Sequence, residues 1–362
     1  MAASGRPLLD VHHLGAGQTG NETWARCVAR ALEDDGGRPF DLAVTRAGRP
    51  HLPPTVSDDR IAPVSSSGAR RLALDLPVTV RRRRSSALVV QYTLPLVRVP
   101  SVVVVHDLSF ERPEAEEWLG RATVLQYRAR VRGSVRRASR VLVPTQWTKQ
   151  DLLQTYAVPE ERVLVAPLAV DPALQSALQA PPEPDGRLVV LAVGTVLPRK
   201  NLAVAASAVR QLRDAGSDVC LRLVGPTPDA GGATLADLHR RLPVGLEVVG
   251  AVTPRELAAE YRSASVLVCP SRFEGFGLTL LEAMAAGLPV VSSHATCLPE
   301  VAGDAALLVD PDDVSAWAGA IGQVLGDDHV RERLISLGRL RCSRYSWAET
   351  ARVLRTALGE VS

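Results

Sequence analysis

The sequence predicts an α/β protein built on doubly wound parallel sheets. Its length of 362 residues favours two or three domains. After residue 187, apolar strands and helices alternate regularly, and this alternation implies a parallel doubly wound sheet. Just before that half, a polar run rich in proline predicts a linker over residues 176–187, because proline disrupts the interior of helices and strands.

The composition excludes several classes of protein. Hydrophobic residues make up 46% of the chain and charged residues 22%, which is the balance of a globular protein. The net charge of +3 is too small to indicate nucleic acid, and no nucleic-acid partner is expected. No apolar run approaches the length of a membrane span and no signal peptide is recognised, so the expected location is cytoplasmic. The cysteines form no close pair and are expected to be reduced thiols: Cys27, Cys220, Cys269, Cys297 and Cys342.

The first half opens with a predicted strand over residues 7–13, a glycine-bearing loop and a helix over residues 21–35. The loop contains Gly15, Gly17 and Gly20. Strand, glycine loop and helix together form the shape of a ligand-binding loop, although the spacing is wrong for the dinucleotide fingerprint G-x-G-x-x-G. A tight turn without a ligand is the alternative interpretation.

Two further strands are predicted over residues 87–92 and 101–107, and the second ends at His106 and Asp107. Ligands of open α/β sheets bind at the carboxyl ends of strands, so His106 is a candidate site residue. A histidine with satisfied hydrogen bonds in the core is the alternative. Residues 46–71 are rich in Pro, Ser, Gly and Asp and are predicted to be irregular.

A long arginine-rich stretch over residues 114–138 is predicted to be helical. Its arginines do not keep strict helical spacing, so part of the set is expected to be solvated. A basic face can dock on anionic lipid, which makes peripheral contact with the inner face of a membrane one interpretation and a solvated face the other. The arginines are Arg121, Arg128, Arg130, Arg132, Arg136 and Arg137.

The second half contains short apolar runs that read as buried strands. They lie at residues 188–193, 219–224, 246–250, 265–269 and 288–292. One helix is predicted to begin at Thr253, with Glu256 completing a capping box. A last helix is predicted to start at Ser346, with Glu349 as a second capping-box partner.

The stretch from Ser271 to Val291, SRFEGFGLTLLEAMAAGLPVV, carries the most specific signal. It follows a predicted strand, passes through a Gly-Phe-Gly turn and enters a helix that stops at Gly287. Such a loop can bind an anion, because it offers free backbone N–H groups and lies at the positive end of a helix dipole. Glu274 lies before the turn, whereas Glu282 is expected near the first helical turn, where its carboxylate can accept hydrogen bonds from a ribose diol. The alternative is an ordinary helix cap flanked by solvated glutamates.

Two adjacent cations, Arg199 and Lys200, follow a predicted strand that ends at Gly194. Their charges suit a diphosphate, with arginine as a fork and lysine as a compact charge. If a phosphate is the leaving group of a reaction, negative charge grows on it, so fixed cations stabilise the transition state more than the ground state. A solvated basic turn is the alternative.

The string FEGFGLTLLEAMAAGLPVV resembles the signature of the retaining glycosyltransferases of the GT-B fold, the class of glycogen synthases and bacterial mannosyltransferases known as glycosyltransferase family 4. The resemblance implies two Rossmann-like domains that face a cleft. It implies an acceptor-binding domain over residues 1–175, a linker over 176–187, a nucleotide-sugar-binding domain over 188–345 and a C-terminal helix over 346–362 that returns to the first domain.

The resemblance also implies roles for individual residues. Catalytic roles fall on Glu274, Lys200, Arg199 and His106. Some members of the family place the arginine directly after the glycine, where this sequence has Thr195, and this departure puts the role of Arg199 in doubt. Donor contacts fall on Gly194, Gly250, Phe276, Gly277, Leu278, Thr279 and Glu282. The loop of Gly15, Gly17 and Gly20 is expected near the donor phosphates and the acceptor.

The implied activity is a retaining, metal-independent hexosyl transfer without a cofactor. The donor is a GDP- or UDP-linked sugar, and the acceptor is a hydroxyl of a glycan, a lipid-linked molecule or a small molecule. The strings PRKN and HDLSFERPE are most similar to bacterial mannosyl- and rhamnosyltransferases of polysaccharide assembly, so GDP-mannose is the first expected donor.

Two alternative functions remain at this point: a nucleotide-sugar epimerase of the same architecture and a non-catalytic nucleotide-sugar-binding partner. Asp310-Pro311-Asp312 is interpreted as a helix cap, and no metal is predicted.

Overall fold

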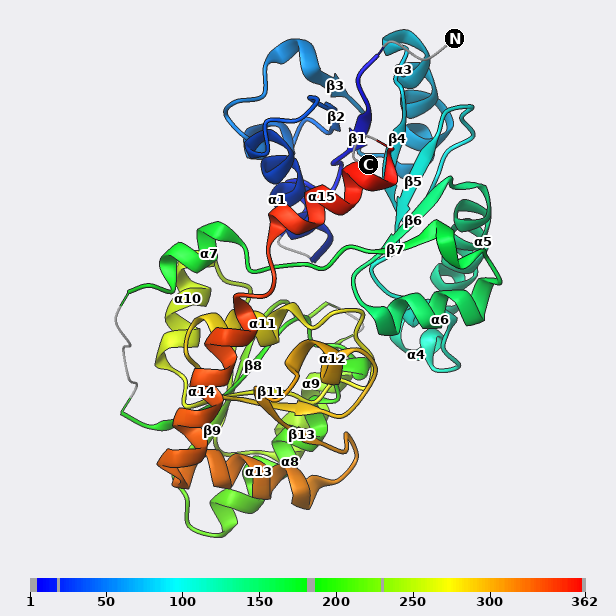
Figure 1. Cartoon of the computed structure of the whole chain (residues 1–362). Helices are drawn as coiled ribbons and strands as arrows, with labels where there is room; N and C mark the ends of the chain where they lie inside the picture. Colours follow the sequence, from blue (N-terminus) through cyan, green and yellow to red (C-terminus); the bar gives the residue numbers. More distant parts are fainter. Residues whose placement is uncertain (1–4, 18–19, 181–185, 229–230, 360–362) are drawn as a thin grey trace. The chain divides into compact units, whose positions relative to one another are not determined.

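The computed structural model describes residues 5–17, 20–180, 186–228 and 231–359 (Figure 1). Contacts divide the chain into two units. The first comprises Met1–Glu111, Ala122–Leu168 and Ser346–Ser362, and the second comprises Arg112–Arg121 and Ala169–Tyr345. The C-terminal helix therefore belongs to the first unit, and the short segment Arg112–Arg121 belongs to the second.

The first unit is built on a parallel sheet of seven strands in the order β3-β2-β1-β4-β5-β6-β7. The central strands are almost wholly buried, as expected when helices cover both faces of a parallel sheet. The chain starts at β1, builds outward to β3 and then returns to the other side of β1 with β4. The strands are β1 Leu8–Asp10, β2 Asp41–Val44, β3 Ile61–Pro63, β4 Leu88–Gln91, β5 Ser101–Val104, β6 Arg140–Val143 and β7 Val163–Val165.

The helices of the first unit connect these strands and include the last helix of the chain. They are α1 Gly20–Asp34, α2 Gly68–Arg70, the π-helical turn η3 Arg71–Asp75, α3 Leu76–Arg83, α5 Arg121–Arg137, α6 Gln146–Tyr156 and α15 Trp347–Ala357, with short 3₁₀ turns at Arg49–His51, Asp58–Arg60, Ser109–Glu111 and Glu160–Arg162. Helix α15 lies beside α1 (Figure 1). There the buried Arg355 donates to both carboxylate oxygens of Asp35 at 2.5 and 2.7 Å and fixes the helix on this unit.

The second unit is built on a parallel sheet of six strands in the order β10-β9-β8-β11-β12-β13. Its core lies between this sheet and its helices, where Trp317 and Ile321 of α13 pack with residues of α8 such as Val209. The strands are β8 Leu188–Val193, β9 Val219–Val224, β10 Leu246–Gly250, β11 Val266–Cys269, β12 Val290–Ser293 and β13 Ala306–Val309. The predicted doubly wound sheet is confirmed.

The helices of the second unit follow the strands in alternation. They are α4 Ala115–Leu119, α7 Pro172–Ala177, α8 Leu202–Asp214, α9 Gly232–Arg241, α10 Pro254–Ser263, α11 Leu278–Ala285, α12 Leu298–Ala302, α13 Val314–Gly326 and α14 Asp328–Cys342, with the 3₁₀ turn η6 Pro198–Lys200. The capping box of α10 is present as predicted, with both reciprocal hydrogen bonds between Thr253 and Glu256. At α15, Ser346 accepts from the Glu349 amide, but the Glu349 carboxylate pairs with Arg352 instead of closing a box.

Three local predictions were wrong. The stretch 114–138 is not one helix, because Gly120 adopts φ 79° and separates α4 from α5. The segment 46–71, expected to be irregular, contributes the edge strand β3, and Pro63 is tolerated there because an edge strand leaves one side of its backbone unpaired. Asp310-Pro311-Asp312, which was expected to be a helix cap, does not cap α13. The cap is Asp313, whose carboxylate accepts from the Ala316 amide.

The division between the units falls after Leu168. Helix α7 ends at Ala177, inside the segment expected to be a linker, and residues 181–185 of that segment lie outside the described residues. All five cysteines are free thiols, and all except Cys342 are buried. Within the described residues, no helix combines the length and the apolar character needed to cross a membrane.

Candidate active site

The topology of the second sheet creates a crevice at the carboxyl ends of β8 and β11. From β8 the chain first builds outward to β9 and β10 and then continues on the other side with β11, so the connections leave these two neighbours in opposite directions. Such a switch point is where ligands bind in open α/β sheets. The two loops that leave it contain the predicted site residues, Gly194 to Lys200 after β8 and Ser271 to Gly277 after β11.

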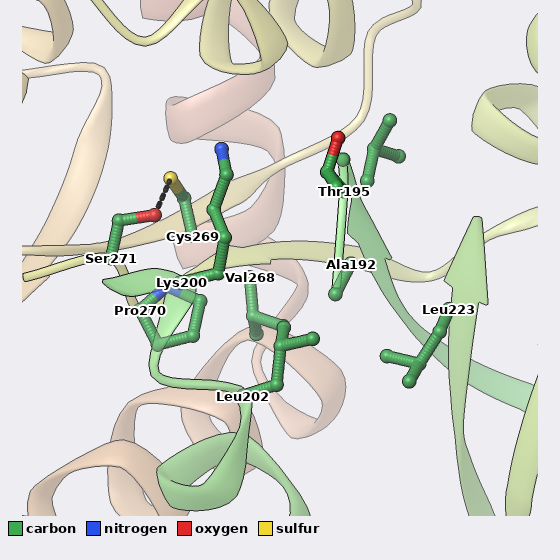
Figure 2. A pocket seen from close by; sticks show the side chains of 11 residues that line it. Ala192, Thr195, Lys200, Leu202, Leu223, Val268, Cys269, Pro270 and Ser271 are labelled. Atoms are coloured by element: carbon green, nitrogen blue, oxygen red, sulfur yellow. Dashed lines mark hydrogen bonds between the residues drawn. The ribbon is translucent and has the colours of Figure 1, made fainter. Parts of the chain in front are cut away.

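A small cavity lies at this switch point, with a volume of about 10 Å³ (Figure 2). Figure 2 shows the Lys200 side chain along its wall, close to Cys269 and Ser271. Gly194 also lines it, with φ 132°, and a Cβ placed on Gly225 would meet the Gly194 carbonyl oxygen at 2.2 Å. The glycine that ends β9 is therefore required for the close approach of two backbones at the crevice.

Glu274 is the centre of the site. Its carboxylate accepts hydrogen bonds from Lys200 Nζ at 2.6 Å, from Ser271 Oγ at 2.7 Å and from Arg199 Nη1 at 3.3 Å. Arg199 Nη1 also donates to the Phe273 carbonyl at 2.9 Å, so one guanidinium joins two consecutive residues of the loop. The structure thus brings together Glu274, Arg199 and Lys200, which the sequence placed in two separate motifs.

The charge state of Glu274 follows from these contacts. Burial alone would raise the pKa of its carboxyl, but the positive charges and hydrogen bonds of Lys200 and Arg199, with the Ser271 hydroxyl, outweigh that effect and lower the pKa to about 2. Glu274 is therefore ionised at neutral pH. Two cations and one carboxylate leave the cluster with one net positive charge, and this surplus suits an anionic ligand.

The Gly-Phe-Gly turn leads directly into α11, as predicted. Gly277 is the N-cap of α11 with φ 89°, and a Cβ there would meet Leu298 Cδ2 at 2.6 Å, so the turn requires glycine. The cap makes no side-chain hydrogen bond, and Leu278 and Thr279 form the first turn of the helix. Backbone N–H groups at this end of the helix suit phosphate oxygens.

Glu282 lies deeper in α11 than the sequence indicated, in the second turn. Its Oε2 accepts from the Tyr261 hydroxyl at 2.7 Å. Burial raises the pKa of the Glu282 carboxyl to about 7; the Tyr261 hydrogen bond opposes this shift, and the nearby charge of Asp171 adds to it. When it is ionised, such a carboxyl offers only acceptor positions and can accept more hydrogen bonds from ribose hydroxyls than its protonated form can.

Gly250 ends β10 with φ 86°, and a Cβ there would meet no atom within 4 Å. Its carbonyl accepts from the Gly225 amide at 2.7 Å, so the backbones that end β9 and β10 are joined at the same edge of the sheet. The side facing away from this bond remains open, because the glycine has no side chain. This openness is what a backbone contact to a ligand requires.

The remaining predicted residues lie in the first unit. Gly15 and Gly17 have φ of 76° and 98°, and Gly20 begins α1; residues 18–19 between them lie outside the described residues. The Gly15 amide donates to Glu22 Oε1 at 2.8 Å, which ties this loop to the first turn of α1. The loop follows β1, beside β4, and this is the switch point of the first sheet.

His106 lies just beyond β5 in the first unit. Its Nε2 lies 2.9 Å from Oε1 of Gln91, which ends β4, and its ring packs edge-on against Trp24 and Tyr92. Burial lowers the pKa of this imidazole to about 4, although Asp107 opposes the shift, so the ring is neutral at physiological pH. This geometry suits contacts with uncharged hydroxyls.

Sequence reasoning missed several residues that contact the predicted site residues or lie at the carboxyl end of β1. Ser271 stands in the quoted string three residues before Glu274, so a local signal existed. Tyr261 lies on α10, and no pattern in the sequence joins it to Glu282. At the end of β1, the buried Asp10 carboxylate lies 3.1 Å from His12 Nδ1 and 3.4 Å from Arg71 Nε, a contact that the sequence also did not indicate.

Among the described residues there is no cluster of three His, Cys, Asp or Glu side chains with the arrangement of a metal site. Asp312, part of the triplet that resembles a metal motif, pairs with Arg272 at 2.5 Å.

Comparisons with known proteins identify the family and the fold of this chain. The family model described as glycosyl transferases group 1 matches residues 187–327, and the model described as Glycosyltransferase Family 4 matches residues 19–174. The chain is 30% identical to an O-antigen chain mannosyltransferase B of Escherichia coli, over 68% of this chain and 67% of that protein. It is 31% identical to an MMP alpha-(1->4)-mannosyltransferase of Mycolicibacterium hassiacum, over 74% of this chain and 65% of that protein. The matched part thus spans about two thirds of these relatives.

Solved structures show the same fold at low sequence identity. WaaG, a glycosyltransferase involved in lipopolysaccharide biosynthesis, superposes with a TM-score of 0.75 at 16% identity and covers 98% of this chain and 100% of its own. The sucrose-phosphate synthase of Thermosynechococcus elongatus gives 0.74 at 19% identity with the same coverage. The two parallel-sheet units have the GT-B fold, and the chain belongs to glycosyltransferase family 4, the glycosyl transferases group 1.

Proposed function

We propose that this chain transfers a hexose, with mannose as the first candidate, from a nucleoside-diphosphate sugar to a hydroxyl acceptor with retention at the anomeric carbon. The observation that carries the proposal is the cluster of Glu274, Lys200 and Arg199 at the second switch point, next to the glycine turn that caps α11. One carboxylate, two cations and a free helix N-terminus match the sugar and the diphosphate of such a donor.

The roles follow from chemistry and position. Arg199, Lys200 and the amides of Gly277 and Leu278 bind the diphosphate, while Glu282 accepts from the ribose hydroxyls. Glu274 exchanges part of its contact with Lys200 for a hydrogen bond from the donor sugar. Each charge-assisted contact contributes about 1.5–3 kcal/mol net. Because the charge on the leaving phosphate grows during the reaction, Lys200 and Arg199 contribute more in the transition state than in the bound donor.

In the proposed reaction, the bond between the anomeric carbon and the phosphate oxygen breaks while the acceptor oxygen bonds to that carbon from the same face. The nucleoside diphosphate leaves and takes the proton of the acceptor hydroxyl. No protein nucleophile is required. His106 and Gly15 in the first unit are assigned to the sugar and acceptor side, because the neutral His106 ring and Gln91 can exchange hydrogen bonds with hydroxyls and the Gly15 loop follows β1 at the switch point of the same sheet.

Mannose is preferred because both of the relatives described above are mannosyltransferases by name, and GDP is the first candidate nucleotide because the sequence resemblance pointed to GDP-mannose. UDP remains the second candidate, since the HepE structure of Anabaena, with a TM-score of 0.70 to this chain, is a complex with UDP and glucose. The epimerase alternative has no support from the two relatives that are mannosyltransferases by name. A non-catalytic role is disfavoured because all four charged site residues are present and three of them are in contact.

Peripheral membrane contact through α5 is part of the proposal for the acceptor side. The helix contains six arginines and no acidic residue, and Leu125 is 54% exposed on it. Three of the arginines are engaged within the unit: Arg128 donates to the Phe110 carbonyl, Arg132 lies over Tyr156, and Arg137 donates to the Leu94 carbonyl. The surface available to anionic lipid is thus smaller than the sequence indicated. Sedimentation with phosphatidylglycerol vesicles, compared with phosphatidylcholine vesicles, tests it.

The first test of the donor is calorimetric binding of GDP, UDP and ADP to the purified protein in a chelator. We expect one nucleotide to bind clearly better than the other two without added metal, because the protein supplies two cations at the phosphates. The sugar donors of that nucleotide are then assayed for transfer, with GDP-mannose first if GDP prevails. A folded protein that binds none of the three contradicts the donor site, and activity that disappears in the chelator contradicts metal independence.

A further inference from the structure

The segment Arg112–Arg121 lies in the first half of the sequence, yet it packs with the second unit, although the residues on either side of it belong to the first unit. Within it, helix α4 contacts the turn η6, which contains Arg199 and Lys200. The segment ends after Gly120, whose φ of 79° turns the chain toward α5. We call this segment, Arg112–Arg121, the strap. It belongs to the first half of the sequence and contacts the turn that contains Arg199 and Lys200.

The strap contacts the residue next to Glu274. The ring of Trp118 lies 6.5 Å from the ring of Phe273, and the guanidinium carbon of Arg112 lies 5.0 Å from the centre of the Phe273 ring. Both rings are buried, with 7% of Trp118 and 4% of Phe273 exposed. Distances of this size are typical of aromatic and cation–π contacts. Phe273 is thus packed by a tryptophan and an arginine from the strap.

Phe273 in turn fixes the catalytic cluster through its backbone. Its carbonyl accepts from Arg199 Nη1 at 2.9 Å, and the next residue is Glu274, whose amide donates to Thr296 Oγ1 at 3.2 Å. A displacement of the Phe273 peptide would move both the carbonyl that Arg199 contacts and the Glu274 residue that follows it. Contacts that differ by about 1 Å in such a cluster change rates strongly.

The other end of the same loop is held in a similar way. Phe276 packs edge-on against Tyr345 at 5.6 Å, and the Tyr345 hydroxyl accepts from Arg341 at 3.0 Å. Arg341 Nε also donates to the Val301 carbonyl at 2.8 Å, so Tyr345 rests on a fixed partner. Tyr345 is the last residue of the second unit before the chain continues into α15. The loop 273–277 therefore has an aromatic contact at each end, each beside a point where the chain passes between the units.

We propose that Trp118 and Tyr345 are positioning residues that, through Phe273 and Phe276, hold Glu274 and the glycine turn in the arrangement that binds and activates the donor. This inference rests on the function proposed above. It assigns no chemical step to either aromatic residue. It assigns them a part in fixing the geometry of the loop, in addition to the hydrogen bonds that Arg199, Lys200, Ser271 and Thr296 make with Glu274.

The decisive measurement is hydrogen exchange in the nucleotide-free protein, because it reports on the loop whether or not a donor binds. Trp118→Ala and Tyr345→Ala are expected to speed exchange of the Arg272 and Glu274 amides by about three- to tenfold, the range that corresponds to loss of one aromatic contact. Trp118→Phe and Tyr345→Phe, which keep a ring, should restore most of the protection. Ile321→Ala is the matched control: it destabilises the core of the same unit without contact with the loop.

Two outcomes would overturn the inference. One is unchanged exchange at Arg272 and Glu274 in both alanine variants, and the other is the same selective increase in Ile321→Ala. If Trp118→Ala fails to fold, Phe273→Leu removes the same ring contact from the other side. A double-mutant cycle of Trp118→Phe with Phe273→Leu must then show coupling in the exchange rates, and additivity contradicts the proposed contact.

Kinetics separate this inference from the function itself. With GDP or UDP as the probe for binding, and the matching sugar donor for turnover, Trp118→Ala should reduce kcat at least threefold more than it weakens nucleotide binding, and Trp118→Phe should rescue kcat. An unaltered protein that binds neither nucleotide rejects the proposed function, while the exchange result still decides whether the two aromatics fix the loop. Equal losses of kcat and affinity that Phe does not rescue reject the positioning role.

Discussion

The two sheets of this protein have the same kind of switch point, but their chemistry differs. At the second, Glu274 lies between Lys200 and Arg199, and the cluster keeps a net positive charge beside a helix N-terminus. At the first, His106 contacts Gln91 and the Gly15 amide donates to Glu22, so polar groups satisfy one another. Topology therefore creates both switch points, and the side chains distinguish them: the second holds the positively charged cluster, whereas at the first Asp10 pairs with Arg71 and the Gly15 amide pairs with Glu22.

The histidines His13 and His106 also distinguish the first switch point from the second. Burial lowers the pKa of His13 to about 3 and that of His106 to about 4, so neither adds positive charge to the first edge near neutral pH. The second edge, by contrast, contains the cations Lys200 and Arg199 in contact with the Glu274 carboxylate. We therefore expect changes at the second edge to affect nucleotide affinity and turnover, and changes at the first to affect turnover with little effect on nucleotide affinity.

The largest effect is expected for Lys200→Ala. Removing a fixed charge from the leaving phosphate should lower kcat by about 10²–10³-fold and weaken nucleotide binding less, because the phosphate charge grows in the transition state. The sequence has one other lysine, Lys149, which pairs with Glu160 in the first unit, and Lys149→Ala is the matched control. Steady-state kinetics with calorimetric affinities test this. Equal losses in kcat and affinity would mean that Lys200 only binds the donor.

The next effect concerns Glu282 and pH. Its folded-state pKa of about 7 lies above the ordinary value of 4.5, so the folded protein retains a proton that the unfolded chain loses, and stability falls as pH rises from about 4.5 to 7. Glu282→Gln should remove this slope, which amounts to about 3 kcal/mol in the free energy of unfolding. Urea unfolding of both proteins at pH 5 and pH 7.5 measures it. Parallel pH profiles for the two proteins would contradict the raised pKa.

Glu274 provides an internal control with the opposite sign. Its pKa is lowered to about 2, so its contribution to stability is present above about pH 4.5 and is lost as pH falls toward 2. Ionisation of Glu282 near pH 7 should also strengthen nucleotide binding as pH rises, since a carboxylate accepts more and stronger hydrogen bonds from ribose hydroxyls than a protonated carboxyl does. Stability and affinity should therefore change in opposite directions across the same pH range.

The sequence predicted the fold and the second edge better than the first, for physical reasons that particular residues show. Strand and helix periodicity is local, so alternation after residue 187 was sufficient to predict the parallel sheet, and the string from Ser271 to Gly287 contained the loop, the cap and both glutamates. The ion pairs of Glu274 with Arg199 and Lys200 followed once β8 and β11 were neighbours, because both motifs follow strands at one edge.

Contacts between distant segments could not be predicted in the same way. Tyr261 and Glu282 lie on different helices, and Trp118 reaches Phe273 from the other half of the chain, so no periodicity relates them. The break at Gly120 was hidden because strong helix formers stand on both sides of it. Arg71 reaches Asp10 only because a π-helical turn precedes α3, and a turn of this kind has no recognisable local signal.

A moderate effect is expected for His106→Ala in the first unit. Loss of its hydrogen-bonding capacity beside Gln91 should lower kcat about five- to twentyfold, as expected for one or two neutral hydrogen bonds, and leave the affinity for GDP or UDP unchanged. His51→Ala, on the surface of the same unit, is the control. Weaker nucleotide binding in His106→Ala would contradict the separation of roles between the two edges.

The smallest effect separates two glycines of the same loop. Both Gly15 and Gly17 have positive φ, so alanine at either position should cost about 1 kcal/mol from the backbone alone. A Cβ on Gly15 would also meet the Ala47 carbonyl oxygen at 2.7 Å, whereas one on Gly17 would meet no atom within 4 Å. Gly15→Ala should therefore destabilise the first unit by about 1 kcal/mol more than Gly17→Ala, as measured by urea unfolding. Equal losses would mean that the loop after β1 can move away from Ala47, so the close approach of Gly15 to Ala47 would not be what requires a glycine at this position.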